Sequence, residues 1–589
     1  MADTVVPEHP TAPVLITPAP RSLEVGGPGF TLRRHTPLVC QSGAEEATEM
    51  LASRLREGLG WAASADLITL PLAQEVPAPV PGAVSILLDA PRQVGREGYT
   101  LTVAPDGVVA RATTRLGALN AVRTLLQLLP TRVMDPDGAA WGRSHPDDAL
   151  GLLPGLRVED APRWAHRGVM IDVARSFLPV EELLRVIEAV SLLKLNVLHL
   201  HLVDDQGWRL EITNEGRSED DPHDYTRLTQ VSGRTAVSLP AWSGRPGRPG
   251  WYTQEDYRRI LAFCRARGIE VVPEIDVPGH VGAALHALEG LCTPGSSHEA
   301  SAEAPTAAAD ASIVVGFSYL DPHAPATRSF LRHVLTQVMD LDPQGRRVHL
   351  GGDEPWAMAE RYGIGPGSAY AELLSYACQV VRARGRVPIG WNEAWSARPQ
   401  ASPSGAGQAA AAMQLQVWDV RGEEAARGQE LAARQGARFI MSPCHHAYLD
   451  MMWDEQAPLG LDWAGVVDIA AARDWDPEEL LEAVGQECIE GVEATLWAET
   501  ARGVEDVETL LLPRLLGTAE VGWCEPLARD PRERERSVAG FMRRCAAYGG
   551  RLRAAGTAFA LVPGVPWREG GPDYGAVVVG QEAERRHRG

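Results

Sequence analysis

From about residue 165 onward, short apolar runs alternate with longer amphipathic segments, and this rhythm limits the possible folds of the 589-residue chain most strongly. Eight of the apolar runs read as strands: RGVMIDV, NVLHLHLV, IEVVPEID, RVHLGGD, VPIGW, MQLQVW, ARFIMSP and GVEATLW. Most of them are separated by helical segments such as PVEELLRVIEAVSLLK, TQEDYRRILAFCRARG and YAELLSYACQVVRARG. Eight strands that alternate with helices indicate an α/β fold of the (β/α)8 TIM-barrel type rather than an open sheet.

The first 160 residues follow a different pattern, typical of a separate small α/β domain. The segment GYTLTVAPDGVVARA alternates like two strands around a Pro-Asp-Gly turn, and ATTRLGALNAVRTLLQLLP has helical spacing and ends at Pro130. We therefore predict an N-terminal α/β domain over 1–160, a catalytic barrel over 161–560 and a disordered tail over 561–589.

Two long interruptions fall inside the predicted barrel, at about 214–250 and 290–316. Both are rich in Gly, Pro, Ser, Ala and acidic residues, which indicates insertions on loops.

The charge balance excludes several classes of function. The formal net charge is -21, which disfavours binding to nucleic acid or to an anionic membrane, because phosphate contacts need a basic surface. No apolar run approaches the roughly 18 residues of a membrane span. The N-terminal stretch lacks the basic and apolar regions of a secretory signal, so we expect a cytoplasmic protein, or a secreted one if a leader has been removed. The eight cysteines are scattered without metal-ligand spacing and read as reduced thiols.

The predicted strands end in residues that suit a functional site rather than a core. Function gathers at the carboxyl ends of barrel strands, where the loops form one open face. The residues at these ends are Arg175, Asp204, Asp205, Asp276, His280, Asp353, Glu354, Trp391, Trp418, Tyr448, Asp450, Trp497 and Glu499. Charged groups are rarely buried without partners, so a purely structural explanation fails for most of this set.

The segment HLGGDEPW, residues 349–356, is the sharpest local feature. Neighbouring side chains of a strand point to opposite faces, so Asp353 and Glu354 can serve one site only if the strand ends and the chain turns. Gly351 and Gly352 permit such a turn. Two close carboxyl groups then push their pKa values apart, which leaves one as a proton donor and the other ionised. A solvated surface pair is the alternative.

His199 and His201 lie two residues apart on one predicted strand and therefore share a face. They could bind a metal, but no third ligand lies at a diagnostic spacing, and hydrogen-bonded residues of the barrel interior are the favoured interpretation. An excess of Trp (16) over Phe (8) suits a site that stacks on the apolar faces of sugar rings.

Motifs spread over about 165–525 resemble one known family. They are DVARSFLP, KLNVLHLHLVDDQGWRLEI, VVPEIDVPGH, HLGGDEPW, IGWNEAW, QVWD, AYLDM, PLGLDWAG and VEATLWAET. In content and order they resemble glycoside hydrolase family 20, the β-N-acetylhexosaminidases, and the N-terminal unit looks like the small α/β domain that precedes the family's barrel.

The resemblance implies an exo-acting, retaining hydrolase of terminal β-linked GlcNAc or GalNAc, in which the substrate's own 2-acetamido oxygen attacks the anomeric carbon to give an oxazolinium intermediate. Glu354 would be the general acid and then the base, Asp353 would hold the acetamido N–H, and Tyr448 would donate to the acetamido oxygen. The resemblance further implies substrate contacts by Arg175, Asp204, His280, Trp391, Trp418, Asp450, Trp463, Trp497 and Glu499. It implies no metal and no cofactor, and a glycan as the partner.

Two positions depart from the family pattern, since Ser176 stands where His is expected and Asp419 where Gly is expected. Three other readings stay open: a disaccharide-releasing enzyme of the same family, a catalytically silent glycan-binding protein on the same barrel, and a metal-dependent sugar isomerase.

Overall fold

The computed structural model describes residues 13–567 except 61–66, 71–78, 137, 139–148, 239–244, 293–305, 366, 398–412, 422, 435 and 482–483. Its described residues form two compact units. One comprises residues up to 162 together with 530–556 and 564–567, and the other comprises 163–529 and 557–563. The predicted boundaries, 1–160, 161–560 and 561–589, stay predictions, and most of the predicted tail lies outside the described residues.

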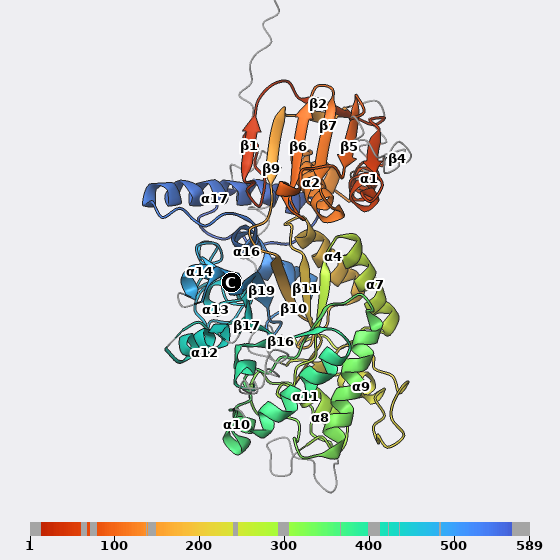
Figure 1. Cartoon of the computed structure of the whole chain (residues 1–589), viewed down its shortest axis with the longest axis vertical. Helices are drawn as coiled ribbons and strands as arrows, with labels where there is room; N and C mark the ends of the chain where they lie inside the picture. Colours follow the sequence, from red (N-terminus) through yellow and green to blue (C-terminus); the bar gives the residue numbers. More distant parts are fainter. Residues whose placement is uncertain are drawn as a thin grey trace, which may run out of the picture. The chain divides into compact units, whose positions relative to one another are not determined.

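The larger unit is a closed barrel of eight parallel strands, which confirms the predicted TIM-barrel class (Figure 1). In barrel order the strands are β10 (His166–Asp172), β11 (Val197–His201), β14 (Glu270–Glu274), β15 (Arg347–His349), β16 (Val387–Trp391), β17 (Gln414–Val417), β18 (Arg438–Met441) and β19 (Ile489–Leu496). Each of the eight predicted runs supplies one strand. The ring closes where β19 pairs with β10, with Gly491 opposite His166.

Helices cover the outside of the barrel, as α4, α7 and α9 show most clearly in Figure 1. The helices of this unit are α4 (Val180–Ser191), α5 (Arg227–Ser232), α7 (Gln254–Ala266), α8 (Gly282–Ala287), α9 (Pro325–Leu341), α10 (Trp356–Tyr362), α11 (Ala369–Ala383), α12 (Glu423–Arg434), α13 (Cys444–Ala447), α14 (Pro477–Leu480), α15 (Val504–Leu511) and α16 (Leu515–Trp523). The short elements in its described part are the hairpin strands β12 (Val203–Asp204) and β13 (Gly207–Trp208), and the 3-10 turns η3 (Asn392–Ala397) and η6 (Gln486–Cys488). No helix in the described part of the chain is long and apolar enough to span a membrane.

Local sequence explains where the outer helices begin. α7 starts at a capping box in which Thr253 and Asp256 satisfy each other's backbone N–H groups, and α9 starts with Pro325, whose missing N–H costs nothing in the first turn. The predicted insertion 214–250 holds one short helix, α5, in its described part.

The barrel interior is apolar in one layer and polar in the next. Val197, Val272, Ile389 and Ile440 form a buried cluster from four strands. Towards the carboxyl ends of the strands, histidine and glutamate side chains replace the aliphatic ones, and the polar layer carries the site.

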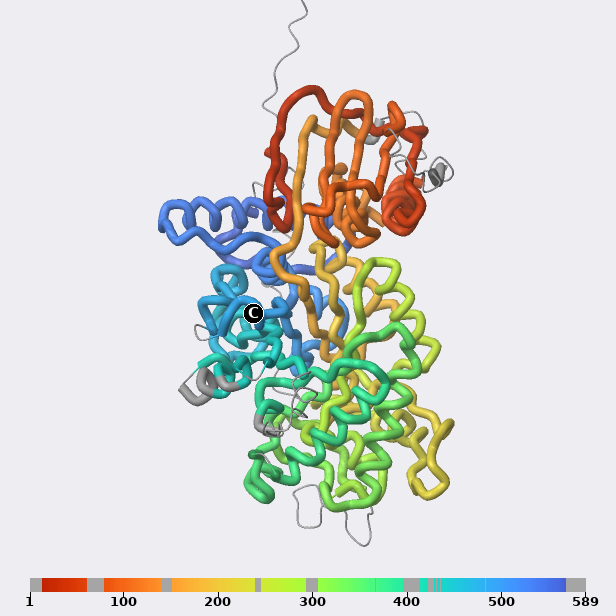
Figure 2. The backbone as a smooth tube through the Cα atoms, viewed as in Figure 1, coloured from red at the N-terminus to blue at the C-terminus, as the bar shows by residue number. Residues whose placement is uncertain are grey.

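The smaller unit contains a seven-stranded sheet of order β1-β9-β6-β7-β5-β3-β4, whose chain course is followed in Figure 2. Its strands are β1 (Ser22–Val25), β3 (Leu38–Gln41), β4 (Leu67–Leu70), β5 (Ala83–Leu87), β6 (Tyr99–Ala104), β7 (Gly107–Ala112) and β9 (Leu156–Asp160), and β2 (Phe30–Arg33) pairs with β8 (Ala149–Leu153). The predicted hairpin is β6–β7. The helices are α1 (Glu45–Leu59), α2 (Arg115–Leu128) and α17 (Pro531–Ala554), with the turns η1 (Arg92–Val94) and η2 (Thr131–Met134).

Candidate active site

The closed parallel barrel brings the predicted residues to one face, because the carboxyl ends of all eight strands point the same way. Arg175 follows β10, Asp204 lies in β12 directly after β11, and His280 follows β14. The remaining residues come after the later strands: Asp353 and Glu354 after β15, Trp391 at the end of β16, Trp418 after β17, Tyr448, Asp450 and Trp463 after β18, and Trp497 and Glu499 after β19.

The two acids of HLGGDEPW leave the strand through a sharp turn, as the glycines predict. β15 ends at His349, and Gly351, Gly352 and Glu354 all have positive φ, of 63°, 88° and 42°. A Cβ atom on Gly351 would lie 1.7 Å from Oδ1 of Asp276, so only glycine fits there. A non-glycine residue with positive φ is uncommon, and here it re-aims the Glu354 side chain.

His280 lies between the paired acids and a third carboxyl group, that of Asp204. Its Nδ1 is 3.3 Å from Oδ1 of Asp204, and its Nε2 is 3.7 Å from Asp353 and 3.6 Å from Glu354. Although burial alone favours the neutral ring, Asp204 and Asp353 raise the pKa of His280 well above its usual value. A cationic imidazolium therefore faces both acids.

The acids of this cluster differ in their pKa values for physical reasons. Burial, reinforced by Glu274 and Glu354, raises the pKa of Asp353 to about 6 despite the opposing effect of His280. Burial also raises the pKa of Asp276, with Asp353 as the next cause. For Asp204, burial is outweighed by Arg175 and His280, so its pKa lies well below the usual range. Separated pKa values within one cluster are typical of acid–base chemistry.

Aromatic rings gather beside these acids. The Trp418 ring lies 6.5 Å from that of Tyr448 and 6.0 Å from that of Trp463, and the Trp497 ring lies 5.8 Å from that of Trp391 and 6.3 Å from that of Tyr448. The five rings form one continuous aromatic cluster, from three successive strand ends and from β19. Such a set offers flat apolar faces together with the hydroxyl group of Tyr448.

A second group of polar side chains lies at Trp497. The Arg175 guanidinium is 4.9 Å from the Trp497 ring and 2.8 Å from Asp204. Among the described residues, both carboxylate oxygens of Asp450 and Oε2 of Glu499 are buried without a hydrogen-bond partner. Buried carboxylate oxygens without donors are costly, so this arrangement is typical of a place where ligand hydroxyl groups donate.

Two residues fix the loops that carry these groups. Asp172, at the end of β10, accepts hydrogen bonds from the backbone N–H groups of Ala174 and Arg175 and from that of Ala498. The buried Arg514 donates to the carbonyls of Leu449 and Met451, on either side of Asp450.

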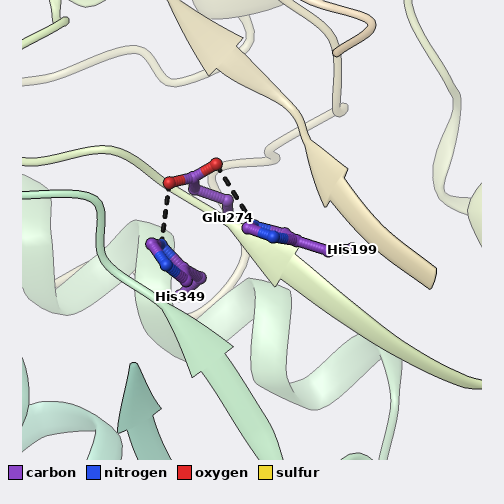
Figure 3. A group of neighbouring side chains, drawn as sticks. All are labelled: His199, Glu274 and His349. Atoms are coloured by element: carbon purple, nitrogen blue, oxygen red, sulfur yellow. Dashed lines mark ion pairs between the residues drawn. The ribbon is translucent and has the colours of Figure 1, made fainter. Parts of the chain in front are cut away.

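The interior histidines form hydrogen bonds with acids, as predicted for His199 and His201. Figure 3 shows Glu274 between His199 and His349, with Oε1 of Glu274 2.7 Å from Nδ1 of His349. His201 contacts Glu274 with Nδ1 and Asp204 with Nε2, the latter at 2.7 Å. His199, Glu274 and His349 could also surround a cation. However, Trp391 donates to Oε1 of Glu274 at 2.9 Å, so hydrogen bonds already use this carboxylate.

The sequence reasoning missed three acids that support the site. Asp172 and Glu274 each interrupt an apolar strand run, and this is the signal that could have found them, because an acid inside a buried strand needs a partner. Glu393 accepts from the Trp418 indole N–H at 3.1 and 3.2 Å, and burial raises its pKa to about 8, with Asp353 as the next cause. No pattern in NEAW distinguishes Glu393 from a surface acid.

The fold and the site together define a class of enzyme. Paired acids with a histidine beside both, at the open face of a TIM barrel and next to a cluster of indole rings, are typical of a glycoside hydrolase.

Comparison with known proteins gives the family. Residues 164–526 match the glycosyl hydrolase family 20 catalytic domain, and residues 14–161 match domain 2 of the same family. The chain therefore belongs to glycosyl hydrolase family 20 and is a glycoside hydrolase, as the motifs predict.

Individual relatives agree with this assignment. The chain is 38% identical over 519 residues to a beta-N-acetylhexosaminidase of Cellulomonas fimi, covering 88% of this chain and 91% of the relative. It also resembles the N-acetyl-beta-hexosaminidase of Streptomyces plicatus in complex with Thio-NAglucal, with a TM-score of 0.78, 32% identity and coverage of 95% of this chain and 99% of that one. The GH20 beta-N-acetylhexosaminidase of Streptomyces coelicolor gives a TM-score of 0.77 at 31% identity, covering 94% and 99%.

Proposed function

We propose that this protein is an exo-acting, retaining β-N-acetylhexosaminidase that removes terminal, non-reducing β-linked GlcNAc or GalNAc through an oxazolinium intermediate. The names of its relatives support the substrate class, since one is a beta-N-acetylhexosaminidase and a mutant of another was solved in complex with product GlcNAc. The mechanism rests on the arrangement of this chain's own residues.

The observation that carries the proposal is the Asp353–Glu354 turn with His280 beside both acids. Glu354 is the more exposed of the two, so the leaving oxygen and then the attacking water can reach its carboxyl group. It protonates the leaving oxygen as the glycosidic bond breaks, and then removes a proton from the attacking water.

Asp353 acts on the substrate's acetamido group. As a carboxylate it accepts the acetamido N–H and stabilises the positive charge that develops when the acetamido oxygen attacks the anomeric carbon. Tyr448 donates its hydroxyl to that oxygen. Trp391, Trp418 and Trp497 supply apolar walls, and the Glu393 carboxyl holds the Trp418 indole in place.

Exo action is supported by the group at Trp497. This group combines the Arg175 guanidinium with the carboxyl groups of Asp450 and Glu499. Both oxygens of Asp450 and Oε2 of Glu499 have no hydrogen-bond partner among the described residues. Such a set binds the hydroxyl groups of a terminal, non-reducing sugar. Trp463, which is half-exposed, suits a contact with the aglycone.

The test compares an aryl 2-acetamido-2-deoxy-β-glucoside with the matching 2-hydroxy glucoside. Fast cleavage of the acetamido sugar alone is expected, because only that substrate carries the nucleophile. Equal cleavage of both would require a nucleophile from the enzyme and would contradict the mechanism. Binding of the acetamido sugar without cleavage would favour the glycan-binding alternative, and cleavage only of an aryl disaccharide would favour the disaccharide-releasing one.

A further inference from the structure

An exposed aromatic surface begins two residues after Glu354. Trp356, the first residue of α10, is 56% exposed, and its backbone N–H donates to the Glu354 carbonyl at 2.7 Å. Tryptophan is usually buried for most of its surface, so an indole left open this close to a catalytic acid calls for an explanation.

A second segment extends this surface. Val314 and Phe317 are 58% and 45% exposed, and the glycine between them, Gly316, lies against the Trp356 ring. A Cβ atom on Gly316 would be 2.5 Å from Cε3 of that ring and 3.1 Å from the Glu354 carbonyl oxygen. The Ala357 N–H also donates to the Gly316 carbonyl at 2.9 Å. One side of the indole therefore rests on backbone while more than half of its surface faces solvent.

The segment that carries Val314 and Phe317 is anchored to the active site. Ser318 donates to Asp205, and it accepts the Val281 N–H at 2.9 Å, next to His280. Further back, the Ser312 carbonyl accepts from Gln206, which in turn contacts Arg175 at 3.1 Å. These hydrogen bonds fix the position of the exposed surface relative to the catalytic groups. An apolar patch without a function would not need such a fixed position.

We propose that Trp356, with Phe317 and Val314, is a binding site for the leaving-group sugar of an oligosaccharide substrate. This inference rests on the proposed function. Glu354 protonates the leaving oxygen, so the sugar attached to that oxygen must pass on the Glu354 side of the site, where Trp356 lies. The axial C–H groups of a β-linked hexosamine present an apolar face that packs on an indole. Trp356 would thereby set a preference for glycan over small leaving groups.

The experiment compares two leaving groups in one enzyme. The substrates are the β-1,4-linked N,N′-diacetyl disaccharide of glucosamine and the methyl β-glycoside of N-acetylglucosamine, whose leaving group is too small to stack. For W356A we expect the ratio of kcat/KM for the disaccharide to that for the methyl glycoside to fall about tenfold, mainly through KM, as expected for the loss of one aromatic stacking contact. W356F should restore most of the ratio, and F317A should lower it about threefold.

The control is Leu152→Ala, which removes an apolar side chain of the N-terminal unit that is 69% exposed, more than Trp356, and should leave the ratio at its wild-type value. A W356A enzyme with the wild-type ratio would overturn the leaving-group site alone. A changed oligomeric state of W356A with an unchanged ratio would also overturn it and would assign the surface to protein contact. A wild-type enzyme that cleaves neither glycoside would overturn the proposed function and this site with it.

Discussion

Among the acids at the open face, Glu354 differs from its neighbour in its contact with water. Its side chain is 22% exposed against 11% for Asp353, although the two are adjacent in the chain. A group that acts first as acid and then as base must be reached by the leaving oxygen and then by a water molecule, whereas a group that stabilises a developing cation is more effective where water is excluded. The positive φ of Glu354 produces this difference, because it turns the second acid away from the direction of the first.

Replacing Glu354 with Gln should lower kcat at least about 10²-fold, the usual contribution of a general acid, while thermal unfolding stays close to wild type. Steady-state rates on an aryl glycoside with a poor leaving group measure the loss. Glu360→Gln, an exposed acid of α10, is the control and should keep full activity. Near-wild-type turnover by the Glu354 variant would end its assignment as the proton donor.

The raised pKa of Asp353 predicts an acidic limb in the pH profile. Its carboxyl must be ionised to stabilise the acetamido cation, and burial raises its pKa to about 6. As the pH falls through 6, the carboxylate takes up a proton, so kcat/KM should fall about tenfold per pH unit below that value. The profile is measured on an aryl N-acetylglucosaminide between pH 4 and 8 at constant ionic strength. Asp353→Asn should be slow at every pH and lack this limb; a variant that keeps the limb would assign it to another group.

At the scale of single elements, the turn after β15 ends the strand and also positions the two acids, Asp353 and Glu354. Gly351 and Gly363 both have positive φ, of 63° and 73°, but their surroundings differ. A Cβ on Gly351 would collide with the Asp276 carboxylate, whereas a Cβ on Gly363 would meet nothing closer than the Ser368 Cβ at 4.0 Å. Substitution of Gly363 therefore tests the effect of backbone strain alone, whereas substitution of Gly351 adds a clash with the Asp276 carboxylate.

Gly351→Ala should reduce kcat/KM about 10²-fold or more, because the chain must shift to relieve the clash and carries Asp353 and Glu354 with it. Gly363→Ala meets no clash but only backbone strain, of about 1–3 kcal/mol because its φ of 73° and ψ of 165° suit glycine alone, and it should keep its rate. Rates and melting temperatures of both variants check this. Equal losses of activity in the two variants would show that strain, not position, matters.

The strands and the strand-end residues could be predicted because both follow simple periodic rules. Eight apolar runs gave the eight barrel strands, and the parallel closure of the barrel places their ends together, whatever the identity of the loops. The supporting acids could not be found in this way. Glu393 acts through the indole of Trp418, 25 positions later, and a contact between distant positions leaves no local pattern. Asp172 and Glu274 do leave a local pattern, because each is a charged residue within an apolar run. Their hydrogen-bond partners, however, come from other parts of the barrel and are known only once the barrel is formed.

At the scale of the whole molecule, the chain is organised as two units that do not follow sequence order. α17, near the C-terminal end, groups with the N-terminal residues rather than with the barrel that precedes it. The link within this unit is specific. Arg551, which is partly buried, donates to the carbonyls of Leu126, Gln127 and Leu129 at the end of α2. These are carbonyls that a helix end leaves without intrahelical partners.

The side chain of Arg551 should therefore stabilise the smaller unit without affecting catalysis. Arg551→Leu leaves three carbonyls without their donor and should destabilise this unit by about 3 kcal/mol, while Arg551→Lys, with a single ammonium group, should recover part of that loss. Hydrogen exchange at the C-terminal turn of α2 reports the effect directly. Arg543→Ala, an exposed position of the same helix, should leave exchange unchanged.

No residue proposed for catalysis lies in this unit, so kcat of the folded Arg551→Leu enzyme should stay within about twofold of wild type. Slowed catalysis with unchanged exchange in α2 would mean that Arg551 acts on the active site rather than on the unit that contains it.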